Sequence, residues 1–320
     1  MAGDMVAYTY NGDLHVHESP SQSQVGQDNR VQISRSETGT IRITGAKNAD
    51  GTTTLIGNGF NSNFSSFKTF NGNSIRNIFI TTGGGNDVVE MMPGAQYIRN
   101  NVTIDTSGPS ARDADQVFLD RTIYGKNLTV NTGGGDDLVD MQFNSIVGSM
   151  TIDTGKGADV VIAKKSHLVG SSNLIRTWAQ PSEIDRDVVL VEDVTALGLG
   201  IVTGGGDDSI TVRRYQQNFQ QNLSQSNPIG FLGIDAGAGH DTVSLEKVVV
   251  DDVFADLGSG RDFLDLTGVK TKAGVRVHGG SEWDIVRRPA FQPIGENQIH
   301  TSSTGVEEYS NRRAQFIKNF

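Results

Sequence analysis

A heptapeptide pattern, Gly-x-Gly-x-Asp-x-aliphatic, recurs along most of this chain and constrains its fold more than any other feature. Six copies are strict, and a seventh, degraded copy keeps Gly280, Asp284 and Val286. Repetition at a near-constant spacing indicates a repeat architecture, whereas one isolated copy would indicate little. The aspartates of the seven copies are Asp87, Asp137, Asp159, Asp208, Asp241, Asp262 and Asp284.

Two further repeats keep the aspartate and lose the glycines. In these, Asp115 precedes Val117 and Asp187 precedes Val189. With both included, successive aspartates are 28, 22, 22, 28, 21, 33, 21 and 22 residues apart. The base period is therefore 21 or 22 residues, and insertions lengthen the three longer repeats.

Short segments with alternating apolar residues lie on both sides of the motif. Leu128 and Val130 precede one copy, and Val139 and Met141 follow it. Alternation with a period of two predicts half-buried strands. The 39 glycines of the chain suit tight turns, which require positive φ. A second set of glycines follows the second strand: Gly125, Gly148, Gly170, Gly198, Gly230, Gly274 and Gly295.

These periodicities predict an all-β fold. Specifically, we expect a right-handed parallel β-solenoid (β-helix) of about ten coils, with a base period of 21–22 residues and loop insertions. Each coil would be a strand, a Gly-rich turn, a second strand and a glycine turn. Stacking would bury the apolar residues in a continuous core, so we expect Val139, Val161, Val243 and Leu264 to be buried.

We expect one continuous domain with three parts. Residues 1–75 would form N-terminal coils and a cap, residues 76–296 the regular solenoid, and residues 297–320 a C-terminal cap or a junction. Alternating residues predict early strands at 12–17, 31–33 and 40–44. The segment from Arg312 would be a short helix or a final strand. The Gln- and Asn-rich insertion 213–228 would be a solvated loop or a contact surface.

Composition excludes several classes of protein. The chain has no cysteine, so disulfides and thiolate metal sites are excluded. A net charge of −10 without a basic stripe argues against a nucleic-acid partner. The sequence contains no run of 18 consecutive apolar residues, so it predicts no membrane-spanning helix. The first residues lack a signal peptide, and we expect one to have been removed from a secreted precursor.

The segment from Asn127 to Val139, NLTVNTGGGDDLV, resembles the extracellular β-strand-repeat proteins of planctomycete-type bacteria. The likeness covers roughly residues 75–290. It implies a β-solenoid fold and a secreted or cell-surface location, and it implies no particular activity.

The turn is also similar to the calcium-binding RTX nonapeptide, Gly-Gly-x-Gly-x-Asp-x-aliphatic-x. Two departures separate this chain from that pattern. RTX repeats recur every nine residues, whereas one copy occurs here in each repeat of 21 or 22 residues or more. The first RTX glycine is replaced, for example by Thr82, Thr132 or Ala236.

The resemblance to RTX turns implies a calcium ion between like turns of adjacent coils. Asp carboxylates and turn carbonyls are ligands that Ca²⁺ prefers, and Asp136 and Asp207 would add charge. The alternative is that each Asp accepts hydrogen bonds from the N–H groups of its own turn and binds no metal. The predicted metal ligands are Asp87, Asp137, Asp159, Asp208, Asp241, Asp262 and Asp284.

A second column of polar residues lies at the end of the first strand of each repeat. It would be a solvated row or an acid-lined groove for carbohydrate. Lys164, Lys165 and His167 would be a solvated turn or would supply the base of a lyase. The column consists of Asp105, Asn131, Asp153, Asp235, Asp256 and His278.

Other candidates are weaker. His15 and His17 lie on one face of a predicted strand, which is a minimal metal-binding pattern. Trp178 and Trp283 read as packing residues, although an exposed Trp would favour a sugar platform. No Gly-x-Ser-x-Gly motif is present. We therefore expect no catalytic residues.

We expect a non-enzymatic scaffold or adhesion module of an extracellular or cell-surface protein, with calcium as a candidate stabilising ion. Its partners would be carbohydrate, a cell-surface protein or further copies of itself. One alternative is a polysaccharide-binding or polysaccharide-degrading protein. Another is a self-assembling subunit of a surface layer or filament.

Overall fold

In the computed structural model of this chain, all regular secondary structure among the described residues is β-strand. Contacts between residues divide the chain into two compact units, Met1–Val160 (unit 1) and Val161–Phe320 (unit 2). The predicted boundaries near residues 75 and 296 stay predictions. The structure describes residues 4–19, 27–58, 61–92, 96–108, 112–178, 184–217, 230–287, 299–301, 306–310 and 313–315.

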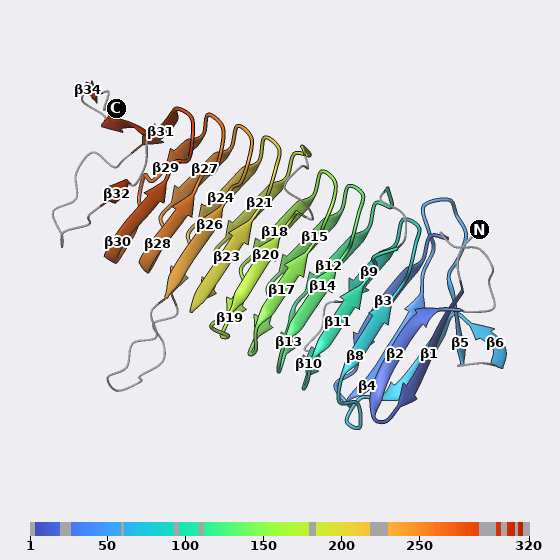
Figure 1. Cartoon of the computed structure of the whole chain (residues 1–320). Helices are drawn as coiled ribbons and strands as arrows, with labels where there is room; N and C mark the ends of the chain where they lie inside the picture. Colours follow the sequence, from blue (N-terminus) through green and yellow to red (C-terminus); the bar gives the residue numbers. More distant parts are fainter. Residues whose placement is uncertain are drawn as a thin grey trace, which may run out of the picture. The chain divides into compact units, whose positions relative to one another are not determined.

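Unit 1 contains three columns of parallel strands, in which each strand pairs with its counterparts in adjacent repeats (Figure 1). The first column is β3 (Arg30–Arg35), β9 (Val88–Met91), β12 (Gln116–Asp120) and β15 (Leu138–Gln142). The second is β10 (Gln96–Ile98), β13 (Thr122–Tyr124) and β16 (Ser145–Ile146). The third is β2 (Asp13–Glu18), β8 (Ile78–Thr81), β11 (Val102–Asp105), β14 (Leu128–Asn131) and β17 (Met150–Asp153).

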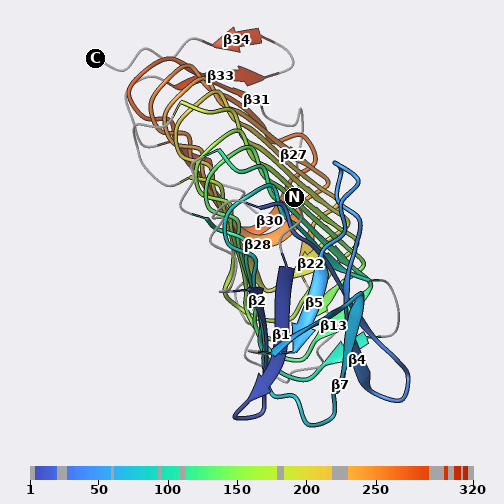
Figure 2. The ribbon, with the colours of Figure 1, turned by 90° about the vertical axis from the view of Figure 1, so that its right-hand side faces the viewer.

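Antiparallel strands complete the N-terminal end of unit 1 (Figure 2). β1 (Asp4–Tyr10) pairs with β2, and β4 (Thr40–Gly45) lies between β3 and β7 (Phe67–Asn71). β5 (Leu55–Asn58) pairs with β6 (Asn61–Ser65). The strands expected at residues 12–17, 31–33 and 40–44 are therefore confirmed. Their pairing satisfies backbone groups that a bare strand edge would leave open.

Unit 2 repeats the same three columns. The first is β21 (Val188–Glu192), β24 (Ser209–Arg213), β27 (Thr242–Glu246), β29 (Phe263–Asp265), β31 (Asp284–Arg287) and β33 (Val306–Ser310). The second is β19 (His167–Leu168), β22 (Thr195–Ala196) and β25 (Gln216–Gln217). The third is β20 (Asn173–Arg176), β23 (Gly198–Val202) and β26 (Phe231–Asp235).

Two long strands of unit 2, β28 (Val249–Asp256) and β30 (Lys270–His278), run through the second and third columns, and β32 (Ile299–Thr301) pairs with β30. β34 (Arg313–Gln315) pairs antiparallel with β33, so the segment after Arg312 contains a strand. Most of the Gln- and Asn-rich insertion lies outside the described residues. β18 (Val160–Lys164) contains the division between the units.

The aliphatic residue of the motif is buried, as the sequence predicts. Val139, Val161, Val243 and Leu264 are each 0% exposed. In unit 2, Val243 pairs in register with Leu264. Full burial of such a side chain stabilises the fold by about 1.5–3 kcal/mol. The parallel columns with stacked apolar residues are compatible with a β-solenoid.

Each full repeat has three strands rather than the expected two, and its second corner differs from the expected glycine turn. Left-handed φ at that corner belongs to non-glycine residues, such as Arg121 (φ 46°) and Phe143 (φ 56°). Gly125 and Gly148 lie later, between the second and third columns, without a left-handed φ. A Cβ on Gly148 would lie 2.3 Å from Oδ1 of Asn127. Close approach of neighbouring repeats, not backbone freedom, therefore requires glycine there.

Candidate functional site

The repeated aspartates lie in the interior of each unit. All seven predicted metal ligands, together with Asp115 and Asp187, are at most 2% exposed. Each lies directly before or at the start of a first-column strand, and the aspartates of the six strict copies follow the two glycines of the turn. In one turn, Gly133 (φ 99°) and Gly135 (φ 121°) are left-handed, so the chain reverses sharply and Asp137 enters the core.

Backbone N–H groups link these aspartates into a ladder in unit 1. The N–H of Asp87 donates to Oδ1 of Asp115 at 2.8 Å. The N–H of Asp115 donates to Asp137 at 2.8 Å, and that of Asp137 to Asp159 at 2.9 Å. Each carboxyl therefore satisfies a buried backbone donor one repeat earlier in the chain, which would cost about 1–3 kcal/mol if unpaired.

The same ladder runs through unit 2. Asp187 donates to Asp208, and Asp208 to Asp241, both at 2.8 Å. Asp241 donates to Asp262 at 2.8 Å, and Asp262 to Asp284 at 3.0 Å. The donor N–H of each bond thus belongs to the adjacent repeat. The alternative without a metal had placed that N–H in the aspartate's own turn.

Where the residue before the aspartate is polar, as at Asp136 and Asp207, its side chain forms a second, outer hydrogen bond whose donor lies in the following repeat. Oδ1 of Asp136 accepts from the N–H of Ala158 at 3.0 Å. Oδ1 of Asp207 accepts from the N–H of His240 at 2.9 Å. Asp136 and Asp207, expected to add charge near calcium, hold neighbouring turns together here.

The early repeat expected in residues 1–75 includes a ladder position that the sequence did not predict. The N–H of Asn29 donates to Oδ1 of Asp87 at 2.7 Å, so Asn29 takes the place of an aspartate at the start of the ladder. The residues between them include the antiparallel strands β4, β5, β6 and β7. The available signal was the Asn29-x-Val31 spacing, which matches the Asp-x-aliphatic part of the motif.

The second carboxyl oxygen of most ladder residues makes no hydrogen bond of standard geometry although it is buried. A buried carboxylate oxygen without a partner is costly, and protonation removes that cost by neutralising the group. A neutral carboxyl can also donate a hydrogen bond from this oxygen. The oxygens are Oδ2 of Asp87, Asp115, Asp137, Asp208, Asp241, Asp262 and Asp284.

Burial raises the pKa of the ladder aspartates, and adjacent carboxyls raise several of them further. Burial raises the pKa of Asp87 to about 9, although the Thr82 hydroxyl partly offsets this. It raises the pKa of Asp115 and that of Asp241 to about 8. The pKa of Asp284 rises to about 7 for the same reason. Burial therefore favours the protonated form of these carboxyls over the ionised one.

The ladder carboxyls offer fewer free oxygens than a calcium ion needs, whereas each can still take up a proton. Calcium takes 6–8 oxygen ligands, whereas one carboxyl oxygen of each aspartate already accepts a backbone N–H. Among the described residues, no group of three or more His, Cys, Asp and Glu side chains could hold a metal ion. These observations do not test binding, and calcium stays a prediction.

The outward polar column is present in both units. Asp105, Asn131 and Asp153 pair in register in unit 1. In unit 2, Asp256 lies in register between Asp235 and His278. The residues lie at the surface, and Nδ1 of His278 lies 3.0 Å from Oδ1 of Asp256.

The weaker candidates have identifiable surroundings. The His15 ring stacks between Tyr8 and Phe79, with centroids 5.4 and 5.2 Å away. Lys165 occupies the left-handed second corner with φ 49°, which favours the solvated-turn interpretation. Trp283 is 45% exposed, so a role in contacting a ligand stays open.

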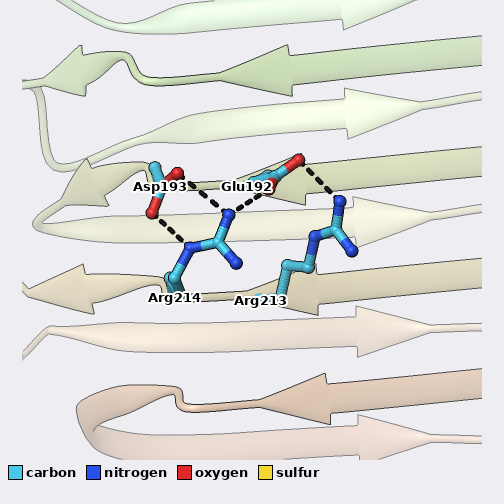
Figure 3. A network of polar contacts seen from close by, with 4 residues as sticks. All are labelled: Glu192, Asp193, Arg213 and Arg214. Atoms are coloured by element: carbon cyan, nitrogen blue, oxygen red, sulfur yellow. Dashed lines mark hydrogen bonds and ion pairs between the residues drawn. The ribbon is translucent and has the colours of Figure 1, made fainter.

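Unit 2 also carries a network of four charged side chains (Figure 3). Nε of Arg214 contacts Oδ1 of Asp193 at 2.6 Å, and its Nη2 also contacts Glu192. Nη2 of Arg213 contacts the other oxygen of Glu192 at 2.8 Å. Hydrogen bonding to Arg213 lowers the pKa of Glu192, and hydrogen bonding to Arg214 lowers that of Asp193. The network joins two adjacent repeats at their second corners.

No family model matches this chain, and no curated protein and no solved structure matches it either.

Proposed function

We propose that this chain is a non-enzymatic scaffold or adhesion module of an extracellular or cell-surface protein. One observation supports this most: the acidic group of the repeat points inward and accepts a backbone hydrogen bond from the adjacent repeat. The motif therefore builds and spaces the repeats. Outward positions, which alternate with the buried ones, stay available for contacts with partners.

The finer description of the fold belongs to this proposal. The repeats would be coils of a right-handed parallel β-solenoid, about ten in number. The three columns of parallel strands in each unit support it, because each repeat contributes one strand to each column. Right-handed crossover between parallel strands of one sheet is also the strong general preference.

The extracellular location rests on the resemblance to β-strand-repeat proteins. The proposed partners are carbohydrate, a cell-surface protein or other copies of this chain. Within the described part of the chain, there is no helix with the length and apolar character needed to cross a membrane.

Calcium stabilisation forms a separate, conditional part of the proposal. Metal binding requires ionised carboxylates, so any calcium effect would grow as pH rises. Calcium would then raise the melting temperature at pH 9 more than at pH 5. A melting temperature at pH 9 that neither calcium nor a chelator changes, with no metal found by elemental analysis, would remove calcium from the proposal.

The function is tested by incubating the whole chain with a panel of polysaccharides and bacterial envelope preparations. We expect retention on a surface or polymer without the release of reducing ends or unsaturated sugars. Release of either product would show catalysis and overturn the proposal. Absence of retention on every surface would also count against it, and light scattering on the same samples would detect self-assembly.

A further inference from the structure

A depression of about 200 Å³ lies on the outer surface of unit 1, where β12 and β15 end. Outward side chains of both strands line it, because Phe118 pairs in register with Asp140, and Asp120 with Gln142. The second corners of the same repeats close it. The lining residues are Phe118, Leu119, Asp120, Arg121, Asp140, Gln142 and Phe143.

The aromatic side of this depression is held in place by its backbone. Phe143 is 44% exposed and occupies a left-handed corner with φ 56°. The N–H of Arg121, at the equivalent corner, donates to the carbonyl of Gln142 at 3.0 Å. The Arg121 guanidinium lies 5.3 Å from the centre of the Phe143 ring. Two corners of adjacent repeats therefore place an aromatic ring and a guanidinium side by side.

The polar side offers both hydrogen-bond acceptors and donors. Nε2 of Gln142 donates to both oxygens of Asp140, at 3.0 and 2.9 Å. Oδ2 of Asp120 lies 3.4 Å from Nη1 of Arg121. Carboxylates accept through several lone pairs, while amide and guanidinium groups donate. Adjacent hydroxyls of a sugar ring need this mixture, and its C–H face packs on an aromatic ring.

We propose that this depression binds a single neutral sugar ring within, or at the end of, a polysaccharide. Its volume is below the range of about 300–1,000 Å³ that is usual for drug-sized ligands, which favours one ring. Two carboxylates but one guanidinium line it, so an acidic sugar is repelled and a neutral one is preferred. The inference rests on the proposed adhesive role, for which it supplies the ligand class and the residues.

The experiment is calorimetric titration of the full chain with methyl glycosides of glucose, galactose, mannose and N-acetylglucosamine, and with glucuronate as the acidic probe. We expect one neutral glycoside to bind and glucuronate to bind more weakly. Phe143→Asn should weaken binding about tenfold, because it removes the ring while Asn tolerates a left-handed φ. Asp140→Asn, which keeps the shape but removes charge, should weaken it as well.

Phe254→Ala is the matched control. Phe254 is 46% exposed, similar to Phe143, but lies on β28 of unit 2. Its replacement should leave the affinity unchanged. Absence of binding by the intact chain, tighter binding of glucuronate, or an unchanged affinity in a folded Phe143→Asn variant would overturn the site.

The outcomes for the site and for the adhesive role are distinguishable. Unchanged retention of the Asp140→Asn and Phe143→Asn variants on polysaccharide would overturn the site and leave the adhesive role standing. Cleavage of a bound polysaccharide by the intact chain would overturn the non-enzymatic role. The site would still be supported if Phe143→Asn lost binding in that case.

Discussion

The backbone N–H of Asp241 donates to Oδ1 of Asp262 at 2.8 Å, so each of these aspartates serves the repeat before its own. Both side chains are buried, and Oδ2 of each lacks a hydrogen bond of standard geometry. Burial raises the pKa of Asp241 to about 8 and that of Asp262 to about 6. The group that orders the turns is therefore also a proton-binding group, with consequences for stability.

The first prediction is that stability falls as pH rises. In the folded chain the pKa of Asp87 is about 9 and that of Asp241 is about 8, above the ordinary value of 3.8. Between pH 3.8 and these values, the folded state therefore binds more protons than the unfolded state does. The stability that each raised pKa contributes is fully present below about pH 4 and is lost progressively as pH rises to about 9. The loss is about 1.4 kcal/mol per pH unit for each group within its window.

Urea unfolding at a series of pH values measures this effect. We expect the free energy of unfolding to decrease from pH 5 to pH 9. A profile that is flat or rises over this range would show that the ladder carboxyls are ionised in the folded chain at neutral pH.

The second prediction concerns Asp241→Asn. The amide oxygen can still accept the N–H of Asp208, while the side chain no longer ionises. The variant should lose less stability than the parent chain between pH 6 and pH 9, and the difference should approach about 1.4 kcal/mol per pH unit. Asp136→Asn is the control, because Asp136 is exposed. Parallel pH profiles for all three proteins would contradict the prediction.

The sequence predicted the strands, their parallel stacking and the burial of residues such as Val139 and Val243, because these follow from period-two alternation within a longer repeat. The sequence did not predict that the Asp137 side chain points into the core. A carboxyl after a Gly-rich turn is equally consistent with an outward metal site, and only the neighbouring N–H decides between them. The left-handed corners at Arg121 and Phe143 also escaped, because no glycine marks them. The depression that we propose as a sugar site depends on these corners and was missed for the same reason.

The third prediction concerns Gly157→Ala. Gly157 has φ 115°, and a Cβ there would lie 2.1 Å from the carbonyl oxygen of Gly135 in the adjacent repeat. Strain and overlap should together destabilise the chain by about 3 kcal/mol or more. Gly200→Ala is the control, because its φ is not left-handed and its nearest contact would be 3.4 Å from Cδ1 of Leu174. Urea unfolding should separate the two variants, and equal stabilities would show that the turns relax without cost.

The fourth prediction concerns Arg214→Gln in the charged network of unit 2. Hydrogen bonding to Arg214 lowers the pKa of Asp193, so this contribution to stability is present above the unfolded pKa and is lost as pH falls. The variant should melt at a lower temperature than the parent chain at pH 7 and low salt, and it should be less sensitive to acid. Because the side chains are partly exposed, added salt should shrink the difference.

Arg76→Gln provides the comparison for this network. Nε of Arg76 lies 3.8 Å from Oδ1 of Asp13, and its side chain is 63% exposed, so its loss should change the melting temperature little. Melting curves at low and high salt distinguish the two cases. If Arg214→Gln lowers the melting temperature equally at both salt concentrations, the guanidinium stabilises unit 2 by packing at its left-handed corner, where φ is 51°, and not by its charge.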